Sequence, residues 1–274
     1  MRTKKRGHAL ALTAGTLAAA LFGLTATAVA DTVDTARGFA FGLELRGPAA
    51  VSARPVAEAL LPDGPETSED TLLNVPADPA VNSATLHVEA AVAPESSIEA
   101  ILQDEITAEF PDAPPTWNTR GYAITEDLAA VSSTVTADVI ESESTAACVD
   151  GDVVYGSGVR IVNLAVAGSN IPVLNPSPNQ VVFDQLGIRI VLWETNWDSA
   201  TGGLADGDTV FTNAIHVTAP GGIDLVVSHS EASATCAGER RRPPRPEPEP
   251  EPEPPGVPQA PPAAPVEGQP TFTG

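Results

Sequence analysis

Apolar and polar residues alternate along most of the central part of the chain. Phe39, Phe41, Leu43 and Leu45 are separated by small or polar residues, which predicts a strand with one buried face. The same alternation recurs at residues 86–92 and 135–139, and further strands are expected at 159–166, 187–193, 209–218 and 223–230. Gly, Pro, Asn and Asp clusters separate these segments. The pattern predicts an all-β protein.

The last two predicted strands form a hairpin through residues 219–222 in this interpretation. An apolar face shared by both strands sets the register. The expected pairs are Val217 with Ile223, Ile215 with Leu225, His216 with Asp224, and Asn213 with Val227. Asn213 then lies on the apolar face, so it needs a buried hydrogen-bond partner.

One segment departs from the strand pattern. Its apolar residues have helical spacing, and Ser96 with Glu99 resembles a capping box. Those apolar residues are Ile98, Ile101, Leu102 and Ile106. We expect a short helix over residues 97–109, ended by Pro111 and the prolines that follow, that covers a sheet edge.

The first thirty residues have the pattern of a secretion signal. A basic start is followed by an apolar stretch from Ala9 and by Ala28-Val29-Ala30, a small-x-small cleavage site. An uncleaved membrane anchor is the alternative, since the apolar stretch is about long enough to span a bilayer. Cleavage is favoured by the Ala-x-Ala ending. The signal then comprises residues 1–30, a folded domain comprises 31–238, and a tail comprises 239–274.

The tail has a composition of its own. Pro and Glu alternate from Pro246 to Pro254, which precludes both helix and sheet ladders, while the like charges extend the chain. Such a segment is a semi-rigid spacer that can hold a folded domain away from a wall or membrane. A disordered tail without a role is the alternative.

The charge of the chain restricts its partners. Removing the signal and its four positive charges takes the formal charge from −22 to −26. Such an excess of carboxylates repels nucleic acid and anionic lipid. It favours solubility and weak attraction for divalent cations, so we expect no cofactor beyond weakly bound Ca²⁺. No membrane span is expected after signal cleavage.

Two cysteines, Cys148 and Cys236, remain after the signal. Export would place them in an oxidising space, where paired thiols persist. A metal site would need further His or Cys ligands at close spacing, and neither residue has them. We therefore predict one disulfide between Cys148 and Cys236.

Four segments together are typical of a known family: residues 36–43, 146–148, 213–217 and 225–230. In these segments the chain resembles the choice-of-anchor P proteins, which are secreted, mainly actinobacterial proteins with a β-rich domain and varied C-terminal attachment devices. The resemblance covers most of residues 31–236. It implies a secreted or cell-surface location and a β-rich architecture, and it supplies no active site.

No catalytic motif is found. The histidines beyond the signal are His87, His216 and His229, and a nucleophile site would use one of the last two with Ser228 or Ser230. Strand neighbours point to opposite faces, so both serines point away from His229. Residues 155–158 only approximate a nucleophile elbow.

Two Asp-Gly-Asp sequences, at residues 150–152 and 206–208, could donate oxygens to Ca²⁺. Neither has the spacing of a twelve-residue calcium loop. Asp-Gly is primarily a turn signal between strands, so we interpret both as turns and predict no metal site.

The best ligand-binding candidates are Trp117 and Trp197, which lie in polar, loop-like sequence where an exposed ring could stack on a sugar. Trp193 follows an apolar run and is expected in the core. Together these patterns predict an antiparallel β-sandwich with Greek-key-like connections, one short helix and a Pro-rich tail. We expect a secreted or envelope-associated, non-enzymatic module that binds a cell-wall glycan or a surface protein. A wall-acting hydrolase and a purely structural envelope component are the alternatives.

Overall fold

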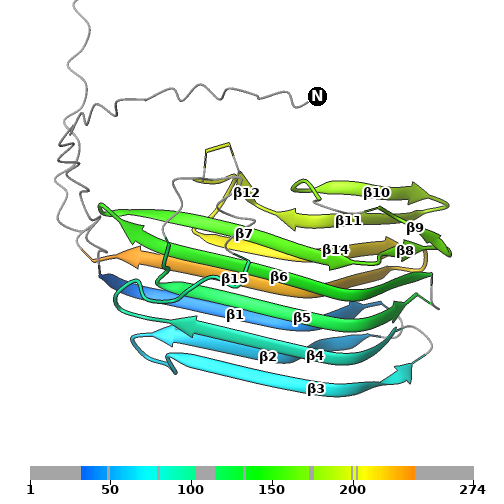
Figure 1. Ribbon diagram of the computed structural model, residues 1–274, viewed down its shortest axis with the longest axis horizontal. Helices are drawn as coiled ribbons and strands as arrows, with labels where there is room; N and C mark the ends of the chain where they lie inside the picture. Colours follow the sequence, from blue (N-terminus) through cyan, green and yellow to red (C-terminus); the bar gives the residue numbers. More distant parts are fainter. Residues whose placement is uncertain are drawn as a thin grey trace, which may run out of the picture. The chain divides into compact units, whose positions relative to one another are not determined.

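The described residues form two antiparallel sheets that pack face to face (Figure 1). The computed structural model describes residues 32–47, 50–78, 81–102, 115–131, 134–172, 176–198, 200–201 and 203–237. This part of the chain is an all-β sandwich, as the alternation predicts. The predicted signal and Pro-rich tail lie outside the described residues. Within the described ranges, no helix is long and apolar enough to cross a membrane.

The first sheet has six strands in the order β10-β11-β14-β15-β1-β2. Their bounds are β1 Val33–Arg46, β2 Val51–Leu61, β10 Gln180–Gln185, β11 Ile188–Thr195, β14 Thr209–Ala219 and β15 Ile223–Cys236. The second sheet has seven strands in the order β3-β4-β5-β6-β8-β9, with β7 paired to β6. Their bounds are β3 Thr67–Asp78, β4 Val81–Val92, β5 Thr119–Ala130, β6 Val135–Val149, β7 Asp152–Val162, β8 Ala165–Val166 and β9 Ser169–Asn170. A separate short pair consists of β12 Trp197–Asp198 and β13 Gly203–Leu204.

The connections follow a meander, which corrects the expected Greek-key-like connections. Most strands pair with a neighbour in the sequence, and the pairings that depart from this order join β1 to β15, β11 to β14 and β6 to β8. Short turns favour sequential antiparallel pairing, because they return the chain directly beside the strand it has just left. Both ends of the domain therefore lie on adjacent strands of the six-stranded sheet.

The predicted disulfide is confirmed. Cys148 on β6 and Cys236 on β15 are fully buried, and their Cα atoms are 5.5 Å apart. The bond links the two sheets. The main hydrophobic core lies between the sheets and includes Leu86, Ile140 and Leu225.

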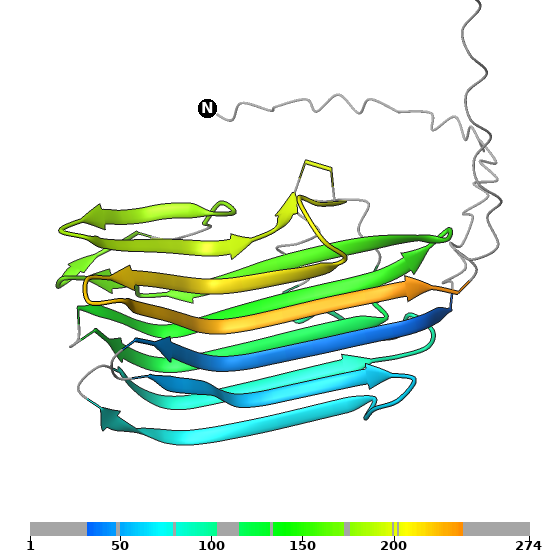
Figure 2. The ribbon, with the colours of Figure 1, turned by 180° about the vertical axis from the view of Figure 1, so that it is seen from behind.

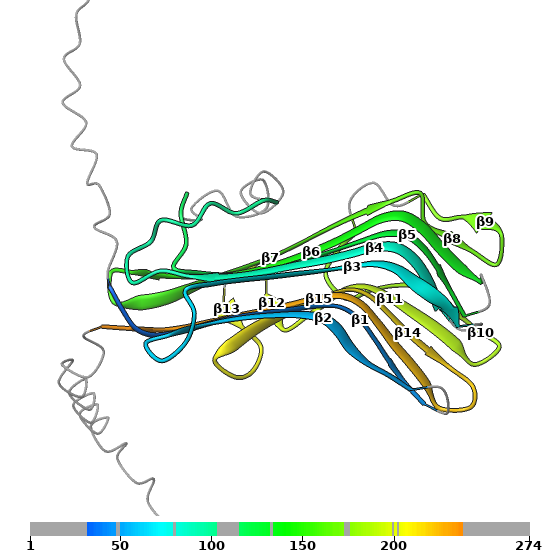
Figure 3. The same cartoon turned by 90° about the horizontal axis from the view of Figure 1, so that it is seen from below.

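In many strands, the set of alternate side chains that faces inward changes partway along the strand. These changes lie side by side across the sheets, at one level of the sandwich. In β1, Gly38 and Ala40 are buried before the change, and Leu43 and Leu45 after it. Ser228 on β15 has a φ of 51° at this level, and the pairing register of β15 with β1 and β14 is the same on both sides of it. Figure 3 shows both sheets bending here, with the outer face of the six-stranded sheet on the inside of the bend. We call this level the crease.

The crease corrects the prediction that Phe39, Phe41, Leu43 and Leu45 share one face. Leu43 and Leu45 face the core, but Phe39 and Phe41 lie on the outer face with His229. The apolar residues keep the same spacing through the crease, although the residues of β1 that face inward change there from Gly38 and Ala40 to Leu43 and Leu45. The predicted burial of residues 86, 88, 90 and 92 in β4 is confirmed.

The predicted hairpin exists, but its register is wrong by two residues. Val217 pairs with Leu225, and Ala219 pairs with Ile223 across a three-residue turn. Because the error is an even number, Ile215, Val217, Leu225 and Val227 keep their predicted core face. His216 and Asp224 are therefore still in contact, at 3.0 Å between Nε2 and Oδ1. Asn213 and His229 lie beyond the crease and face outward, so their predicted place on the apolar face is wrong.

The predicted helix over residues 97–109 is wrong in its described part. Residues 97–102 form a β-bridge between Ile98 and Trp117 and then a turn, and residues 103–109 lie outside the described residues. Ser96 does not cap a helix, since its hydroxyl contacts the hydroxyl of Thr116 at 3.3 Å. The segment does cover the sandwich, over the face of the seven-stranded sheet.

Candidate functional site

Two short sequences occur once in each sheet. Residues 37–40 of β1 read Arg-Gly-Phe-Ala, and residues 120–123 of β5 read Arg-Gly-Tyr-Ala. Residues 229–232 of β15 read His-Ser-Glu-Ala, and residues 87–90 of β4 read His-Val-Glu-Ala. In both sheets the two sequences lie on neighbouring strands.

The pairing register of these repeated sequences is the same in both sheets. Phe39 lies between Glu231 on β15 and Glu58 on β2. Tyr122 lies between Glu89 on β4 and Glu143 on β6. Each sheet thus places one aromatic ring between two glutamates, with an arginine two residues before the ring.

The two repeats meet back to back in the middle of the sandwich. A Cβ atom at Gly38 would lie 2.5 Å from the backbone oxygen of Arg120, and one at Gly121 would lie 2.3 Å from that of Phe39. Real Cβ atoms do not approach other atoms so closely. Both glycines are therefore required by the close approach of the sheets, and the arginine, aromatic and glutamate side chains face outward on opposite sides.

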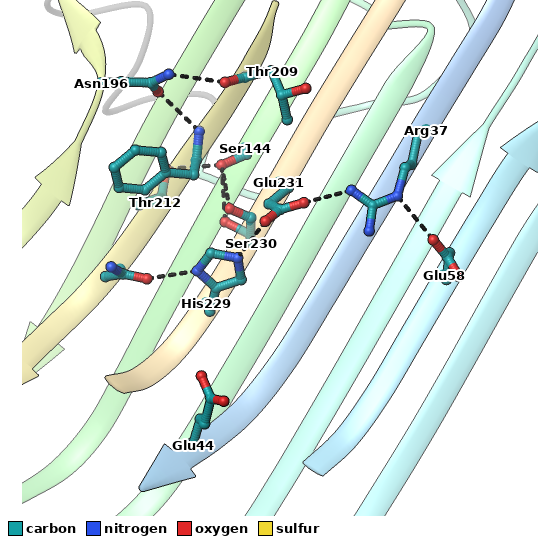
Figure 4. A network of polar contacts seen from close by, with 12 residues as sticks. Arg37, Glu44, Glu58, Ser144, Asn196, Thr209, Thr212, His229, Ser230 and Glu231 are labelled. Carbon is teal, nitrogen blue, oxygen red and sulfur yellow. Dashed lines mark hydrogen bonds and ion pairs between the residues drawn. The ribbon is translucent and has the colours of Figure 1, made fainter. Parts of the chain in front are cut away.

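On the six-stranded sheet this outer face is open. We call Arg37, Phe39, Glu58 and Glu231 the open face. Figure 4 shows its chain of polar contacts: Arg37 donates to Glu58 at 2.8 Å and to Glu231 at 2.6 Å, and Glu231 contacts Nε2 of His229 at 3.1 Å. The Arg37 guanidinium also lies 4.7 Å from the centre of the Phe39 ring. Figure 2 shows no described segment crossing the strands β15, β1 and β2 on this side.

The chain of contacts fixes the charge of the open face. Burial alone would raise the pKa of Glu231, but hydrogen bonds from His229 and Arg37 outweigh burial and lower it. Burial would likewise lower the pKa of Arg37, and its hydrogen bonds to Glu58 and Glu231 raise it. Both groups therefore stay ionised near neutral pH.

Beside the open face, at the crease, the sheet is hollowed into a depression of about 240 Å³. Phe41 and Val226 give it an apolar part, and the Phe41 ring stacks on His229 at 4.4 Å between centroids. The Oδ1 atom of Asn213 accepts a hydrogen bond from Nδ1 of His229 at 2.5 Å. Asn213 therefore has a polar partner on the outer face and not on the apolar face where the sequence placed it. The remaining lining is polar: Glu44, Arg46, His216, Asp224 and Glu231.

The second histidine of the depression is held between two carboxylates. His216 contacts Glu194 at 2.8 Å and Asp224 at 3.0 Å. The hydrogen bond to Glu194 outweighs burial and raises the pKa of His216. The same hydrogen bond lowers the pKa of Glu194. The depression thus combines an apolar part with carboxylates, two imidazoles and the exposed guanidinium of Arg46.

On the seven-stranded sheet the equivalent side chains are Arg120, Tyr122, Glu89 and Glu143, which we call the covered face. Residues 97–102 pass over it (Figure 1), and Glu143 is fully buried. The backbone amides of Ile101 and Leu102 each donate to the Glu143 carboxylate at 2.7 Å. Arg120 donates to the backbone oxygen of Glu99 at 2.9 Å. The chain therefore occupies this face with its own backbone.

The third histidine, His87, lies on the seven-stranded sheet. Its Nδ1 atom contacts the hydroxyl of Thr71 at 2.7 Å, and Nε2 contacts Glu89 at 3.1 Å. Thr71 pairs directly with His87 across β3 and β4, so the contact is a cross-strand pair on one sheet face. A second depression, of about 310 Å³, lies nearby beside Glu89, Arg120 and Glu69.

The predicted ligand-binding residues Trp117 and Trp197 are both buried, with exposed fractions of 0 % and 3 %. Trp117 packs against Ala147, and Trp197 stacks on Trp193 at 6.2 Å between centroids. Neither ring can serve as an exposed platform for a sugar, which corrects the prediction. The predicted core position of Trp193 is confirmed.

The other candidate residues have structural roles. Ser157, within the elbow-like sequence, is buried and accepts a hydrogen bond from Trp193 at 2.8 Å. Ser228 and Ser230 point away from His229, as predicted, but it is the serines and not His229 that face the interior. Asp150 and Gly151 form the tight turn between β6 and β7. In the described part of the chain, no group of three or more His, Cys, Asp or Glu side chains could hold a metal ion.

Sequence reasoning missed the open face. It treated Phe39 and Phe41 as core residues and assigned no role to Arg37, Glu58 or Glu231. The signal that identifies the face is the repeat itself, since Arg-Gly-aromatic-Ala and His-x-Glu-Ala each occur twice.

Comparison with known proteins gives no family to set beside this geometry. No family model, curated protein or solved structure matches the chain.

Proposed function

We propose that this protein is an exported, envelope-associated binding module without catalytic activity, which displays the open face and the adjoining depression to a partner outside the cell. The observation that carries the proposal is the difference between the two equivalent faces. One is occupied by residues 97–102 through hydrogen bonds to Glu143, and the other presents the same side-chain types to solvent.

The location in this proposal is supported by the sequence. Residues 1–30 have the pattern of a secretion signal, and the alternating Pro and Glu residues of the tail suit a spacer. The disulfide between Cys148 and Cys236 agrees with an oxidising compartment. The resemblance to the choice-of-anchor P proteins supports the same location, and we propose membership of that family.

A binding role suits the site better than a catalytic one. His216 and His229 are held by carboxylate and amide groups, and their described hydrogen-bond partners include no hydroxyl or thiol nucleophile. The depression has an apolar floor and both donors and acceptors at its rim, as small-ligand and peptide sites commonly do. A surface protein or a wall glycan fits this chemistry.

The location is tested by fractionating native cells into medium, wall and membrane and measuring the C-terminal peptide of the protein by mass spectrometry. The proposal expects recovery with the envelope. Recovery in the medium alone, with the C-terminal peptide unmodified, would contradict an envelope-associated role.

Binding is tested by co-sedimentation of the purified protein with isolated envelope. Asp224→Asn and Arg46→Ala change the depression, whereas Glu69→Gln changes an exposed carboxylate on the other sheet. The proposal expects weaker retention for the first two variants and unchanged retention for the third. Equal retention of all three would contradict a role for the depression.

A hydrolase is the second candidate, because Thr71, His87 and Glu89 form a hydroxyl, imidazole and carboxylate chain. Release of soluble fragments from isolated walls measures it. Activity lost in Thr71→Val and His87→Asn but retained in Glu69→Gln would establish the hydrolase, and absence of release by the wild type would exclude it for that substrate.

A further inference from the structure

The covering segment contacts its sheet through backbone atoms. Arg120 donates a hydrogen bond to the carbonyl oxygen of Glu99, and Glu143 accepts hydrogen bonds from the amides of Ile101 and Leu102. An arginine and a glutamate on neighbouring strands therefore recognise one carbonyl and two consecutive amides. None of these hydrogen bonds involves a side chain of the covering segment.

The open face contains the same two groups at the equivalent positions. Glu58 pairs with Phe39 as Glu143 pairs with Tyr122, and Arg37 precedes the ring as Arg120 does. Glu58 has an exposed side-chain fraction of 44 %, whereas Glu143 is fully buried. The carboxylate that accepts amides on one sheet is thus accessible on the other.

On the open face, Arg37 binds a second glutamate where Arg120 binds a backbone carbonyl of the covering segment. It donates to Glu58 and to Glu231, while Arg120 donates to Glu89 and to a backbone carbonyl. The Arg37 to Glu58 ion pair is solvent-exposed, and such pairs contribute little to stability, so exchanging it for backbone hydrogen bonds has a small cost.

We propose that the open face binds a peptide segment of a partner protein through the backbone of that segment, in the way that residues 97–102 occupy the covered face. Arg37 then donates to one carbonyl, and Glu58 accepts two consecutive amides, neither of which belongs to proline. The inference rests on the proposed binding function and names its ligand class. Basic side chains flanking the segment are favoured by the strongly negative charge of the chain.

The experiment titrates the ¹⁵N-labelled protein with capped synthetic peptides up to several millimolar and follows backbone amide shifts by NMR. The first peptide is Ser-Ile-Glu-Ala-Ile-Leu, the sequence of residues 97–102, and the second has Lys in place of Glu. Shifts are expected around Phe39, Glu58 and Glu231, with tighter binding of the lysine peptide.

Two variants test the mechanism. N-methylation of the last two residues of the peptide removes both amide donors and is expected to abolish binding. Glu58→Gln in the protein is expected to weaken binding at least about tenfold, since hydrogen bonds to a charged acceptor are lost. Glu69→Gln removes the same charge from an exposed site on the other sheet, and its affinity is expected to stay within about twofold of the wild type.

Several outcomes would overturn the inference. These are absence of binding, equal affinity for the N-methylated peptide, equal affinity of Glu58→Gln, or shifts confined to the covered face. Concentration-dependent self-association that Glu58→Gln abolishes would assign the face to a second copy instead. Retention on protease-treated envelope that Glu58→Gln does not weaken would overturn the peptide inference while leaving the proposed function intact. Absence of retention on any envelope fraction would contradict the proposed function alone.

Discussion

The covered face and the open face are built from the same strand register and nearly the same residues, yet they differ in what lies above them. Tyr122 and Glu143 are buried, while Arg37 and Glu58 remain accessible. In the described part of the chain, residues 101 and 102 bind Glu143 through their backbone amides, and Glu58 has no such partner. The comparison shows that the charged side chains of a sheet face in this protein can bind the backbone of an overlying segment. In the described residues, only the covered face has such a segment.

The same comparison distinguishes a buried carboxylate that stabilises the fold from an exposed carboxylate that a partner could reach. Glu143 is buried and holds a segment of the fold through two backbone amides. Glu58 is exposed and forms an ion pair with Arg37. Hydrogen bonds to a buried charge stabilise by about 1.5–3 kcal/mol, whereas exposed ion pairs contribute about 0–1 kcal/mol. The open face can therefore change partners without loss of the fold.

The largest effect on stability is expected from a substitution that disrupts the close approach of the two sheets. Gly121→Ala would place a Cβ atom 2.3 Å from the backbone oxygen of Phe39 and 2.6 Å from that of Glu231, so the sheets must move apart. We expect a loss of about 3 kcal/mol in the free energy of unfolding, measured by chemical denaturation. Gly203→Ala, whose Cβ would meet nothing closer than 3.5 Å, is the control and should change little. Equal stability of both variants would contradict the close approach.

A smaller effect distinguishes the two glutamates. Glu143→Gln replaces a buried acceptor of two amides and should destabilise the protein by about 2 kcal/mol. Glu58→Gln changes an exposed ion pair and should cost less than about 1 kcal/mol. Denaturation curves of both variants test the comparison, which fails if the two losses are equal or reversed.

A pH effect is expected on the six-stranded sheet. The pKa of His216 is raised above its ordinary value of 6.5 by the hydrogen bond to Glu194, so its contribution to stability is complete below pH 6.5 and lost as pH rises through the raised pKa. The pKa of Glu194 is lowered below 4.5, so its contribution is complete above pH 4.5 and lost as pH falls through the lowered pKa. The pair should stabilise most between these ordinary values.

Denaturation midpoints measured across the neutral and alkaline range test this pH dependence. The charged groups around His216 are Glu194 and Asp224, with Arg189 acting on Glu194 from a distance. His216→Gln should flatten the decline in stability above pH 6.5. A decline that is as steep in His216→Gln as in the wild type would assign it to other groups.

The smallest effect on stability is expected for Arg46→Ala. The Arg46 side chain is 68 % exposed and pairs with Glu44 across the rim of the depression, so its loss should change stability by less than about 0.5 kcal/mol. The same variant should still weaken retention on envelope. Loss of retention together with unfolding would show that the change acts on the fold and not on the binding surface.

Much of the fold could be predicted from the sequence, because period-two alternation and the cysteines report directly on strands and on the disulfide. The strands at residues 86–92 and 223–230 and the bond from Cys148 to Cys236 are all present. Location outside the cell stays a prediction, since residues 1–30 and 239–274 lie outside the described residues.

The site could not be predicted because the crease is invisible in the alternation. The side chains of β1 that face inward change between Phe41 and Leu43 while the apolar residues keep their spacing, so the pattern predicts a core position for two outer-face aromatics. The burial of Trp117 and Trp197 is equally hidden, because polar neighbours in the sequence do not reveal which segments fold back over a ring.

The misassigned helix has a related cause. Ile98, Ile101 and Leu102 have helical spacing, but Glu143, more than forty residues away, accepts the amides of the last two. A long-range acceptor of this kind overrides local propensity. The repeated Arg-Gly-aromatic-Ala sequence relates the two faces to each other, but only the structure shows that the aromatic and charged side chains of both copies face outward.

The most direct test of the account is carboxyl footprinting by mass spectrometry, with and without the envelope extract. In the free protein, Glu58 should be labelled and the buried Glu143 should not. On addition of the extract, Glu58 should become protected while the exposed Glu69 on the other sheet keeps its reactivity. Protection of Glu69 with Glu58 unchanged would show that the partner binds the seven-stranded sheet and would contradict the assignment of the open face as the binding surface.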